Sequence, residues 1–231
     1  MAISLTKENF FWHKVHSLTG IVPVGFYMLQ HLTLNSFSLA GPAYFNGVIG
    51  FFEGMPFHVL FVLEVCLIWV PLLFHAIYGL FIVGRGQSNY FGTKYRWSQN
   101  RMYVFQRFSG IFLFFFLIYH VLTTTGSKYM SHSAEGIRYA GMYETFSNPL
   151  FLAFYALGIL CASYHLCYGI WNFCIRWGIT ISERAQMRVQ KFAFYMFIVV
   201  TLLGWSAIVG FLIPKYSPSA GVGVTAMIRN R

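Results

Sequence analysis

Four of the eight histidines are spaced almost evenly along the chain. His31, His75, His120 and His165 are separated by 44, 45 and 45 residues, and each lies in an apolar stretch. A histidine inside a membrane is costly, and a single one is commonly bonded to a backbone carbonyl or hydroxyl of a neighbouring helix. Four at one interval favour a common role instead. Imidazole binds metal ions and haem iron, so the spacing points to metal ligation.

These histidines need helices that cross a lipid bilayer. A ~30 Å hydrocarbon layer requires ~20 apolar residues of a helix. Five stretches come close to that length: 17–37, 58–83, 107–125, 149–174 and 192–213. The 231 residues are 57% hydrophobic and only 10% charged, which excludes an ordinary soluble domain. We expect an all-α integral membrane protein with five transmembrane helices, the first four forming an up-down-up-down bundle.

The basic residues predict how these helices are oriented. Eleven Lys and Arg side chains precede the first stretch or lie in the second and fourth loops, whereas the first and third loops hold only Lys128 and Arg138. The positive-inside rule then places the N-terminus in the cytoplasm. We expect a cytoplasmic segment at 1–16, a membrane domain at 17–213 and an extracytoplasmic tail at 214–231. Topology also explains the net charge of +10 better than nucleic-acid binding does.

The depth of each histidine follows from its distance to the basic cytoplasmic end of its helix. His31 and His120 lie 17 and 13 residues from that end, or roughly 20–25 Å at about 1.5 Å per residue. His75 and His165 lie 10 and 11 residues from it, or roughly 15 Å. We call His75 and His165 the inner pair, and His31 and His120 the outer pair.

Lateral geometry selects the same two pairs. Two imidazoles that share one metal at about 2 Å hold their helix axes roughly 13 Å apart, which exceeds the spacing of direct neighbours. Diagonal helices fit, and in this bundle the first helix is diagonal to the third and the second to the fourth. A haem between two such imidazoles has no open axial position, which suits electron transfer. Zinc is disfavoured because no third or fourth ligand lies at hand. We expect two non-covalent b haems.

Other polar and small residues on these helices suggest supporting roles. His16, Ser17 and Arg176 stand at the cytoplasmic ends of the first and fourth helices, where charge-assisted hydrogen bonds to propionates of the inner haem would form. The remaining histidines are interpreted as surface residues. Five glycines would give a flat macrocycle room, and they are Gly20, Gly25, Gly79, Gly110 and Gly169.

A short internal repeat links the two halves of the bundle. His75-Ala76-Ile77-Tyr78-Gly79 on the second helix returns as His165-Leu166-Cys167-Tyr168-Gly169 on the fourth. Leu18-Thr19-Gly20 before His31 is matched by Phe108-Ser109-Gly110 before His120. The pattern suggests that helices one and two correspond to helices three and four. The four cysteines form no C-x-x-C motif and are interpreted as packing residues.

Several motifs accompany the histidines. They are His16-Ser17-Leu18-Thr19-Gly20, Gln30-His31, Phe52-Glu53-Gly54-Met55-Pro56-Phe57, Pro71-Leu72-Leu73-Phe74-His75-Ala76-Ile77-Tyr78-Gly79, Gln106-Arg107 and Trp177-Gly178-Ile179-Thr180. With them the chain resembles the di-haem cytochrome b558 anchor subunits of bacterial succinate:menaquinone oxidoreductases. The similarity runs from residue 10 to residue 213 and covers all five expected helices.

The resemblance implies that His75 and His165 bind the haem nearer the cytoplasm and that His31 and His120 bind the outer haem. It also implies a flavoprotein and an iron–sulfur subunit docked at the cytoplasmic face of a bacterial inner membrane. Electrons would pass from them to menaquinone, and succinate would be oxidised outside this chain. A higher oligomer of the complex is compatible with this reading.

Two glutamates are candidates for the quinone site. Glu53, at the outer end of the second helix, would supply the proton for quinone reduction, although a solvated loop carboxylate is an equal reading. Glu64 lies deeper, and an intramembrane carboxylate is by default a functional candidate. Quinol-oxidising fumarate reductases, the main alternative, carry a glutamate two residues before the fourth-helix ligand. Here that residue is Ser163, which puts a compensating proton path in doubt.

Two further alternatives remain at this point. Ascorbate-linked transmembrane cytochromes also pair histidines across four helices, although their electron donors are small molecules. A proton-coupled transporter could use the histidines as a relay. Co-purification with flavin and iron–sulfur subunits separates the first from the complex-bound reading, and an absorption spectrum separates the second.

Overall fold

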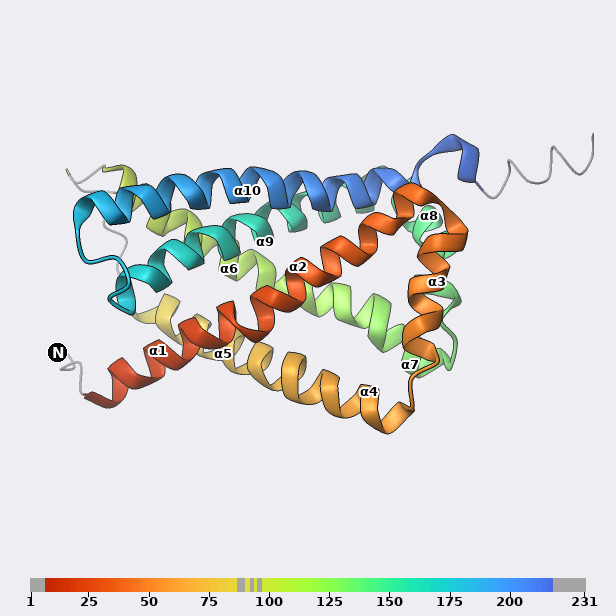
Figure 1. The fold of residues 1–231 in the computed structure, drawn as a ribbon, viewed down its shortest axis with the longest axis horizontal. Coiled ribbons are helices and arrows are strands. Elements are labelled where there is room, and N and C mark those ends of the chain that lie inside the picture. The colour runs from red at the N-terminus through yellow and green to blue at the C-terminus, as the bar shows by residue number, and fades with distance from the viewer. Residues whose placement is uncertain (1–6, 87–89, 92–93, 95–96, 218–231) are drawn as a thin grey trace, which may run out of the picture. The chain divides into compact units, whose positions relative to one another are not determined.

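The computed structural model describes residues 7–86, 90–91, 94 and 97–217, and these residues form helices and turns without any strand. Of the predicted segments, most of the tail at 214–231, the first residues of 1–16 and Arg96 lie outside the described residues. The α-helices, labelled in Figure 1, are α1 Lys7–Ile21, α2 Pro23–Asn35, α3 Pro42–Glu53, α4 Phe57–Glu64, α5 Val70–Arg85, α6 Ser98–Val121, α7 Ser127–Ser131, α8 Tyr139–Ser147, α9 Pro149–Arg176 and α10 Glu183–Phe211.

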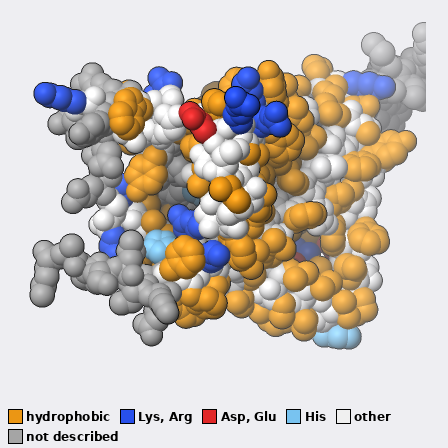
Figure 2. Space-filling model, turned by 60° about the vertical axis from the view of Figure 1, so that its left-hand side comes forward, with side chains coloured by type: hydrophobic (Ala, Val, Ile, Leu, Met, Phe, Trp, Pro, Cys, Tyr) orange, Lys and Arg blue, Asp and Glu red, His pale blue; other side chains and the backbone are white. Residues whose placement is uncertain are grey.

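Four continuous helical segments in the described residues are long and apolar enough to cross a membrane. They are Phe57–Arg85, Ser98–Ser131, Pro149–Arg176 and Glu183–Phe211. The first three contain the apolar stretches 58–83, 107–125 and 149–174, and the fourth covers the stretch 192–213 except for its last two residues. Their lipid-compatible surface is extensive, and hydrophobic side chains cover most of the described surface in view in Figure 2. The all-helical membrane fold expected from composition is therefore confirmed.

The first apolar stretch differs from the single helix expected at 17–37. Helix formation starts at Lys7, and the segment is divided at Val22 between α1 and α2. The cause is Pro23, which lacks an N–H and cannot continue the hydrogen-bond ladder. The amide of Val22 still donates to the carbonyl of Leu18 at 2.9 Å. The helix is thus bent at Val22 and continues beyond it.

Two of the long segments contain a π turn. In Phe57–Arg85 the π turn η2, Val65–Trp69, comes just before Pro71, whose missing amide disturbs the same ladder. In Ser98–Ser131 the π turn η3, Leu122–Gly126, begins two residues after His120. There the hydroxyl of Thr123 donates to the carbonyl of Tyr119 at 2.9 Å, as threonines in membrane helices often do.

The described chain divides into two compact units, each with residues from several helices. The first unit comprises Met1–Leu29, Phe61–Phe114 and Cys161–Val200, and the second comprises Gln30–Leu60, Phe115–Leu160 and Thr201–Arg231. The inner histidine pair belongs to the first unit and the outer pair to the second. Each unit therefore holds one complete pair.

The first unit is held together by helix-to-helix contacts of aromatic side chains. α1 packs along α5, where the rings of Trp12 and Phe74 lie 5.9 Å apart. The indole of Trp171 donates to the carbonyl of Gln186 at 3.1 Å and so joins α9 to α10. Figure 1 lets the reader follow these helices.

The second unit is tied by hydrogen bonds to the backbone of α10. The buried hydroxyl of Tyr139 donates to the carbonyl of Gly210, and the fully buried hydroxyl of Ser38 donates to that of Ala207, both at 2.7 Å. The 3-10 turn η1, Ser36–Ala40, carries this serine. Because such buried polar groups are costly when unpaired, these bonds fix how α8 and η1 meet the end of α10.

Candidate functional site

The inner pair is formed by α5 and α9. The ring centroids of His75 and His165 lie 6.1 Å apart, and the ring planes are at 90°. In each ring Nδ1 donates to a backbone carbonyl: that of His16 at 2.9 Å for His75, and that of Gln106 at 3.1 Å for His165. These bonds fix the tautomer and leave Nε2 of each imidazole as the nitrogen available to a metal.

Two glycines make room for the inner pair. A Cβ at Gly20 would lie 2.3 Å from Cε1 of His75, and a Cβ at Gly110 would lie 2.9 Å from Cε1 of His165. From the sequence these glycines are expected to give a macrocycle room, and at these two positions the structure shows the histidine rings in that space. A Cβ at Gly25, the other glycine of the first apolar stretch, would lie 2.7 Å from the side chain of Leu166.

The three residues expected to bind propionates lie close together in the first unit. The ring of His16 stacks on that of His75, with centroids 4.1 Å apart and planes at 7°. The hydroxyl of Ser17 donates to the carbonyl of Lys14 at 2.9 Å and accepts from the indole of Trp177 at 3.1 Å. The Ser17 hydroxyl thus has both an acceptor and a donor within the protein.

Arg176 is exposed at the end of α9. Its guanidinium donates to the carbonyl of His13 at 3.2 Å. Burial, and next the charge of Arg176, lower the pKa of the His13 imidazole. The positive charge at this end of α9 is accordingly that of Arg176, in the position expected for a partner of an anionic group.

The loop after Arg176 explains part of the Trp177-Gly178-Ile179-Thr180 motif. Gly178 has φ 70°, the left-handed conformation that commonly ends a helix. The amides of Ile179 and Thr180 then donate back to the carbonyl of Cys174 at 2.9 and 3.1 Å. The turn leaves the side chains of Ile179 and Ile181 63% and 87% exposed.

The outer pair is formed by α2 and α6. The ring centroids of His31 and His120 lie 5.8 Å apart, with planes at 81°. The backbone carbonyl of each accepts a hydrogen bond from the side chain four residues later: from Asn35 at 2.7 Å and from Thr124 at 2.5 Å. Nδ1 of His120 lies 3.4 Å from the hydroxyl of the buried Tyr155.

Neither pair is extended by further ligands. Among the described residues no group of three or more His, Cys, Asp or Glu side chains is arranged to hold a metal ion. Each pair therefore offers two nitrogens, the number that a six-coordinate porphyrin iron takes from a protein.

Glu53 ends α3 in the second unit and is not a free carboxylate. Its Oε2 accepts from the guanidinium of Arg138 at 2.7 Å, and both side chains are about one-third exposed. Glu53 also lines a hollow of about 270 Å³. Its other lining residues are Phe57, Lys128, Tyr129, His132, Ser133 and Ala134. The hollow is thus lined by the amine of Lys128, the imidazole of His132 and the carboxylate of Glu53, together with two aromatic rings.

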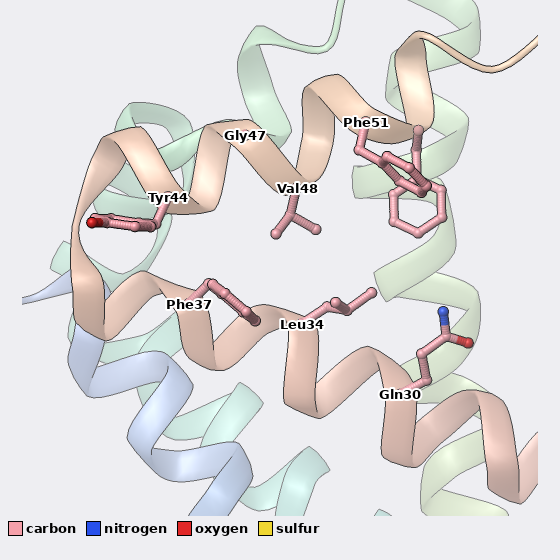
Figure 3. A pocket seen from close by; sticks show the side chains of 8 residues that line it. Gln30, Leu34, Phe37, Tyr44, Gly47, Val48 and Phe51 are labelled. Carbon is pink, nitrogen blue, oxygen red and sulfur yellow. The ribbon is translucent and has the colours of Figure 1, made fainter.

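A second hollow in this unit has a different character. It is a groove of about 390 Å³ between the α2–η1 segment and α3, shown in Figure 3. Leu34, Phe37, Val48 and Phe51 form its walls, with the amide of Gln30 at one end. None of its lining residues carries a carboxylate, an imidazole or an amine. The groove can hold an apolar chain but offers little to proton transfer.

Glu64, the other carboxylate candidate, belongs to the first unit, whereas Glu53 belongs to the second. It ends α4 in the first unit, is half-buried, and acts electrostatically on the phenol of Tyr27. Ser163 is fully buried on α9, and its hydroxyl makes no hydrogen bond within the described residues.

Sequence reasoning missed several residues that support the pairs. Gln106 and Tyr155 contact the rings of His165 and His120, Asn35 and Thr124 bond to the carbonyls of His31 and His120, and Arg138 pairs with Glu53. Only Gln106 carried a usable signal, because it stands 90 residues after His16, the same interval that separates His75 from His165. The others are polar residues at unremarkable positions.

A long-helix membrane fold with paired intramembrane histidines defines a class of transmembrane cytochrome-like anchors, and the comparisons agree. Residues 92–204 match the family described as "Succinate dehydrogenase/Fumarate reductase transmembrane subunit". The chain is also 33% identical over 206 residues to the "Succinate dehydrogenase cytochrome b558 subunit" of Bacillus subtilis (strain 168), covering 89% of this chain and 98% of the relative. The chain therefore belongs to the family of succinate dehydrogenase cytochrome b558 subunits.

Proposed function

We propose that the chain anchors a succinate dehydrogenase complex in a bacterial inner membrane and binds two b haems, one at each histidine pair. The observation that carries the proposal is the separation of 6.1 and 5.8 Å between paired rings. Imidazole nitrogens bind metals at about 2 Å, so two rings on opposite sides of one iron have centroids about 6 Å apart. The spacing of each pair suits two imidazoles that would bind one iron.

When bound, the haems supply one-electron transfer between the iron–sulfur subunit and menaquinone. The chain's own residues hold them. His75 and His165 would ligate the inner iron, and His31 and His120 the outer iron. Arg176 would supply the positive charge for the propionates of the inner haem, with Ser17 and His16 beside it.

The quinone site is assigned to the hollow at Glu53. This hollow has an acid–base pair, an imidazole and an amine, whereas the groove of Figure 3 has none of these. Glu53 would hold or deliver the proton at a quinone oxygen, and Arg138 keeps its carboxylate in place. Glu64, in the first unit, remains a second candidate because intramembrane carboxylates are expensive to retain.

The proposed topology has five spans with the N-terminus in the cytoplasm. Besides the four long helical segments, the bent α1–α2 segment forms the remaining span, which is the first in chain order. The hydrogen bond from Val22 to Leu18 keeps this helix continuous across the bend at Pro23. Residues 17–213 then form the membrane domain, between a cytoplasmic start and an outer tail.

A flavoprotein and an iron–sulfur subunit would dock at the cytoplasmic face. The family supports this, because the similar protein of Bacillus subtilis is the cytochrome b558 subunit of a succinate dehydrogenase.

The direct test is pyridine haemochrome per polypeptide on the purified complex. The wild type should contain two haems, and His75→Ala and His120→Ala should each contain about one, because each removes an axial ligand of one iron. A colourless wild-type subunit would contradict the proposal, as would a variant that loses both haems or neither.

The fumarate reductase direction is the second candidate, since the matching family includes both enzymes. Ser163 favours succinate oxidation, because no carboxylate is present at that position to return a compensating proton. Electron movement toward an outer quinone is then assisted by a membrane potential that is negative inside, at about 2.3 kcal/mol per charge per 100 mV. An uncoupler should therefore lower succinate:menaquinone activity in intact cells. Unchanged activity would reject succinate oxidation assisted by the membrane potential.

A further inference from the structure

The first unit contains the same arrangement twice, at an offset of 90 residues. The His75 ring bonds to the carbonyl of His16, and the His165 ring to that of Gln106, so each ligand is bonded 59 residues back along the chain. Each of these carbonyls also accepts from a hydroxyl three residues later, Thr19 or Ser109, both at 3.0 Å. The short sequence repeat is therefore a structural repeat.

The glycines of the repeat complete the arrangement. Gly20 and Gly110 sit against the two ligand rings. Gly79 lies against the residue at position 16, where a Cβ would be 3.1 Å from Nε2 of His16. Its counterpart Gly169 leaves 3.6 Å to the amide nitrogen of Gln106, an ordinary contact. Position 16 is thus the more tightly confined of the two.

The side chains at the two equivalent positions differ in how they reach the ligand. Gln106 donates from its amide to the backbone carbonyl of His165 at 2.9 Å. His16 instead lays its ring on the ring of His75, nearly parallel and 4.1 Å between centroids. Parallel stacking at that distance restricts rotation of an imidazole about its own axis, and Gly79 lies against Nε2 of the His16 ring.

We propose that His16 is a positioning residue for the inner haem: its stacked ring sets the plane of the His75 imidazole while its carbonyl sets the tautomer. The inference rests on the proposed function, because it assumes that His75 is an axial ligand. It differs from a hydrogen bond between His16 and a propionate, since stacking needs a flat ring and a propionate bond needs a polar hydrogen. His16 itself is not an iron ligand.

The test uses the low-spin ferric EPR signal of the inner haem in the purified complex, which depends on the orientation of the two axial ligand planes. His16→Ala should shift the largest g value of the inner signal while both haems remain bound. His16→Phe, which keeps a flat ring, should restore the wild-type signal. His16→Gln, which keeps a polar hydrogen but no ring, should remain shifted.

Gly79→Ala gives a second readout with a matched control. The added methyl group presses on His16 and should shift the same signal, whereas Gly84→Ala on the same helix, where nothing lies within 4 Å of a Cβ, should leave it unchanged. An unshifted signal in His16→Ala, or recovery with Gln but not with Phe, would overturn the positioning role. If His75→Ala leaves the inner haem in place, it is the assignment of the ligand that fails.

Discussion

The two histidine pairs have similar distances and angles between their rings, but the groups that surround the rings differ. In the first unit the ligand rings are fixed by backbone carbonyls of other helices, and two glycines are needed to seat them. In the second unit the side chains of Asn35 and Thr124 secure the ligand backbones, and the ring of His120 lies near the hydroxyl of Tyr155. The inner rings are thus held by backbone carbonyls, and the side chains of His16 and Gln106 add a stacked ring and a bond to the carbonyl of His165. The outer pair depends on particular side chains.

This difference separates the sensitivity of the two sites to substitution. A backbone carbonyl cannot be removed by changing a side chain, so the first unit is vulnerable mainly where space is limiting. The second unit is vulnerable where a hydroxyl, amide or carboxylate is lost. Four experiments test this contrast, from the largest expected effect to the smallest.

The largest effect is expected for Gly20→Ala. Its Cβ would lie 2.3 Å from Cε1 of His75, a distance that requires the ring to move. The inner haem should be lost and the pyridine haemochrome should fall from two haems to about one, with the outer haem spectrum intact. Gly47→Ala on α3, where a Cβ meets nothing within 4 Å, is the control and should keep both haems.

Glu53→Gln should affect turnover rather than haem content. Loss of a positioned acid or base commonly slows proton transfer on the order of 10²-fold. Quinone reduction by the purified complex should fall by about that factor while both haem spectra stay as in the wild type. Loss of the outer haem in this variant would instead give Glu53 a structural role.

Thr124→Val should weaken the outer site without abolishing it. The change removes the hydroxyl that bonds to the carbonyl of His120 at 2.5 Å, at a cost of about 1 kcal/mol. Thermal loss of the outer haem, followed by absorption, should occur at a lower temperature than in the wild type. Thr123→Val should affect the outer haem less, because the Thr123 hydroxyl reaches the carbonyl of His120 only at 3.3 Å and bonds more closely to that of Tyr119, at 2.9 Å.

The smallest expected effects are shifts of haem potential when a hydroxyl near the ring of His120 or of His165 is removed. Tyr155→Phe removes the hydroxyl 3.4 Å from Nδ1 of His120, and Ser109→Ala removes the one 3.2 Å from Nδ1 of His165. His165 keeps the carbonyl of Gln106, so its haem potential should hardly change. The outer haem potential in Tyr155→Phe should shift more, and the opposite order would contradict the contrast between the units.

Much of the fold and the core of the site could be predicted from the sequence. Apolar stretches and loop charges locate spans because a bilayer imposes length and leaves few polar residues inside. The histidine pairs follow from depth alone, since His31 and His120, and likewise His75 and His165, stand at matched distances from charged ends. The structure places each of these pairs within one unit.

The remainder depended on contacts that no local pattern encodes. Pro23 was visible in the sequence, but whether it bends or ends a helix depends on tertiary packing. The pairing of Glu53 with Arg138 joins residues 85 positions apart. The carbonyl of Gln106 is a backbone atom, and its role leaves no mark on the identity of the residue that carries it.

The doubled arrangement in the first unit has a consequence for ancestry. A shorter polypeptide with one Gly20-like seat and one His75-like ligand would possess half of an iron site and an uncovered face. A second copy, related by a two-fold axis, would supply the missing half. Fusion of two such copies would free positions 16 and 106 from having to be identical, and in this chain they hold histidine and glutamine.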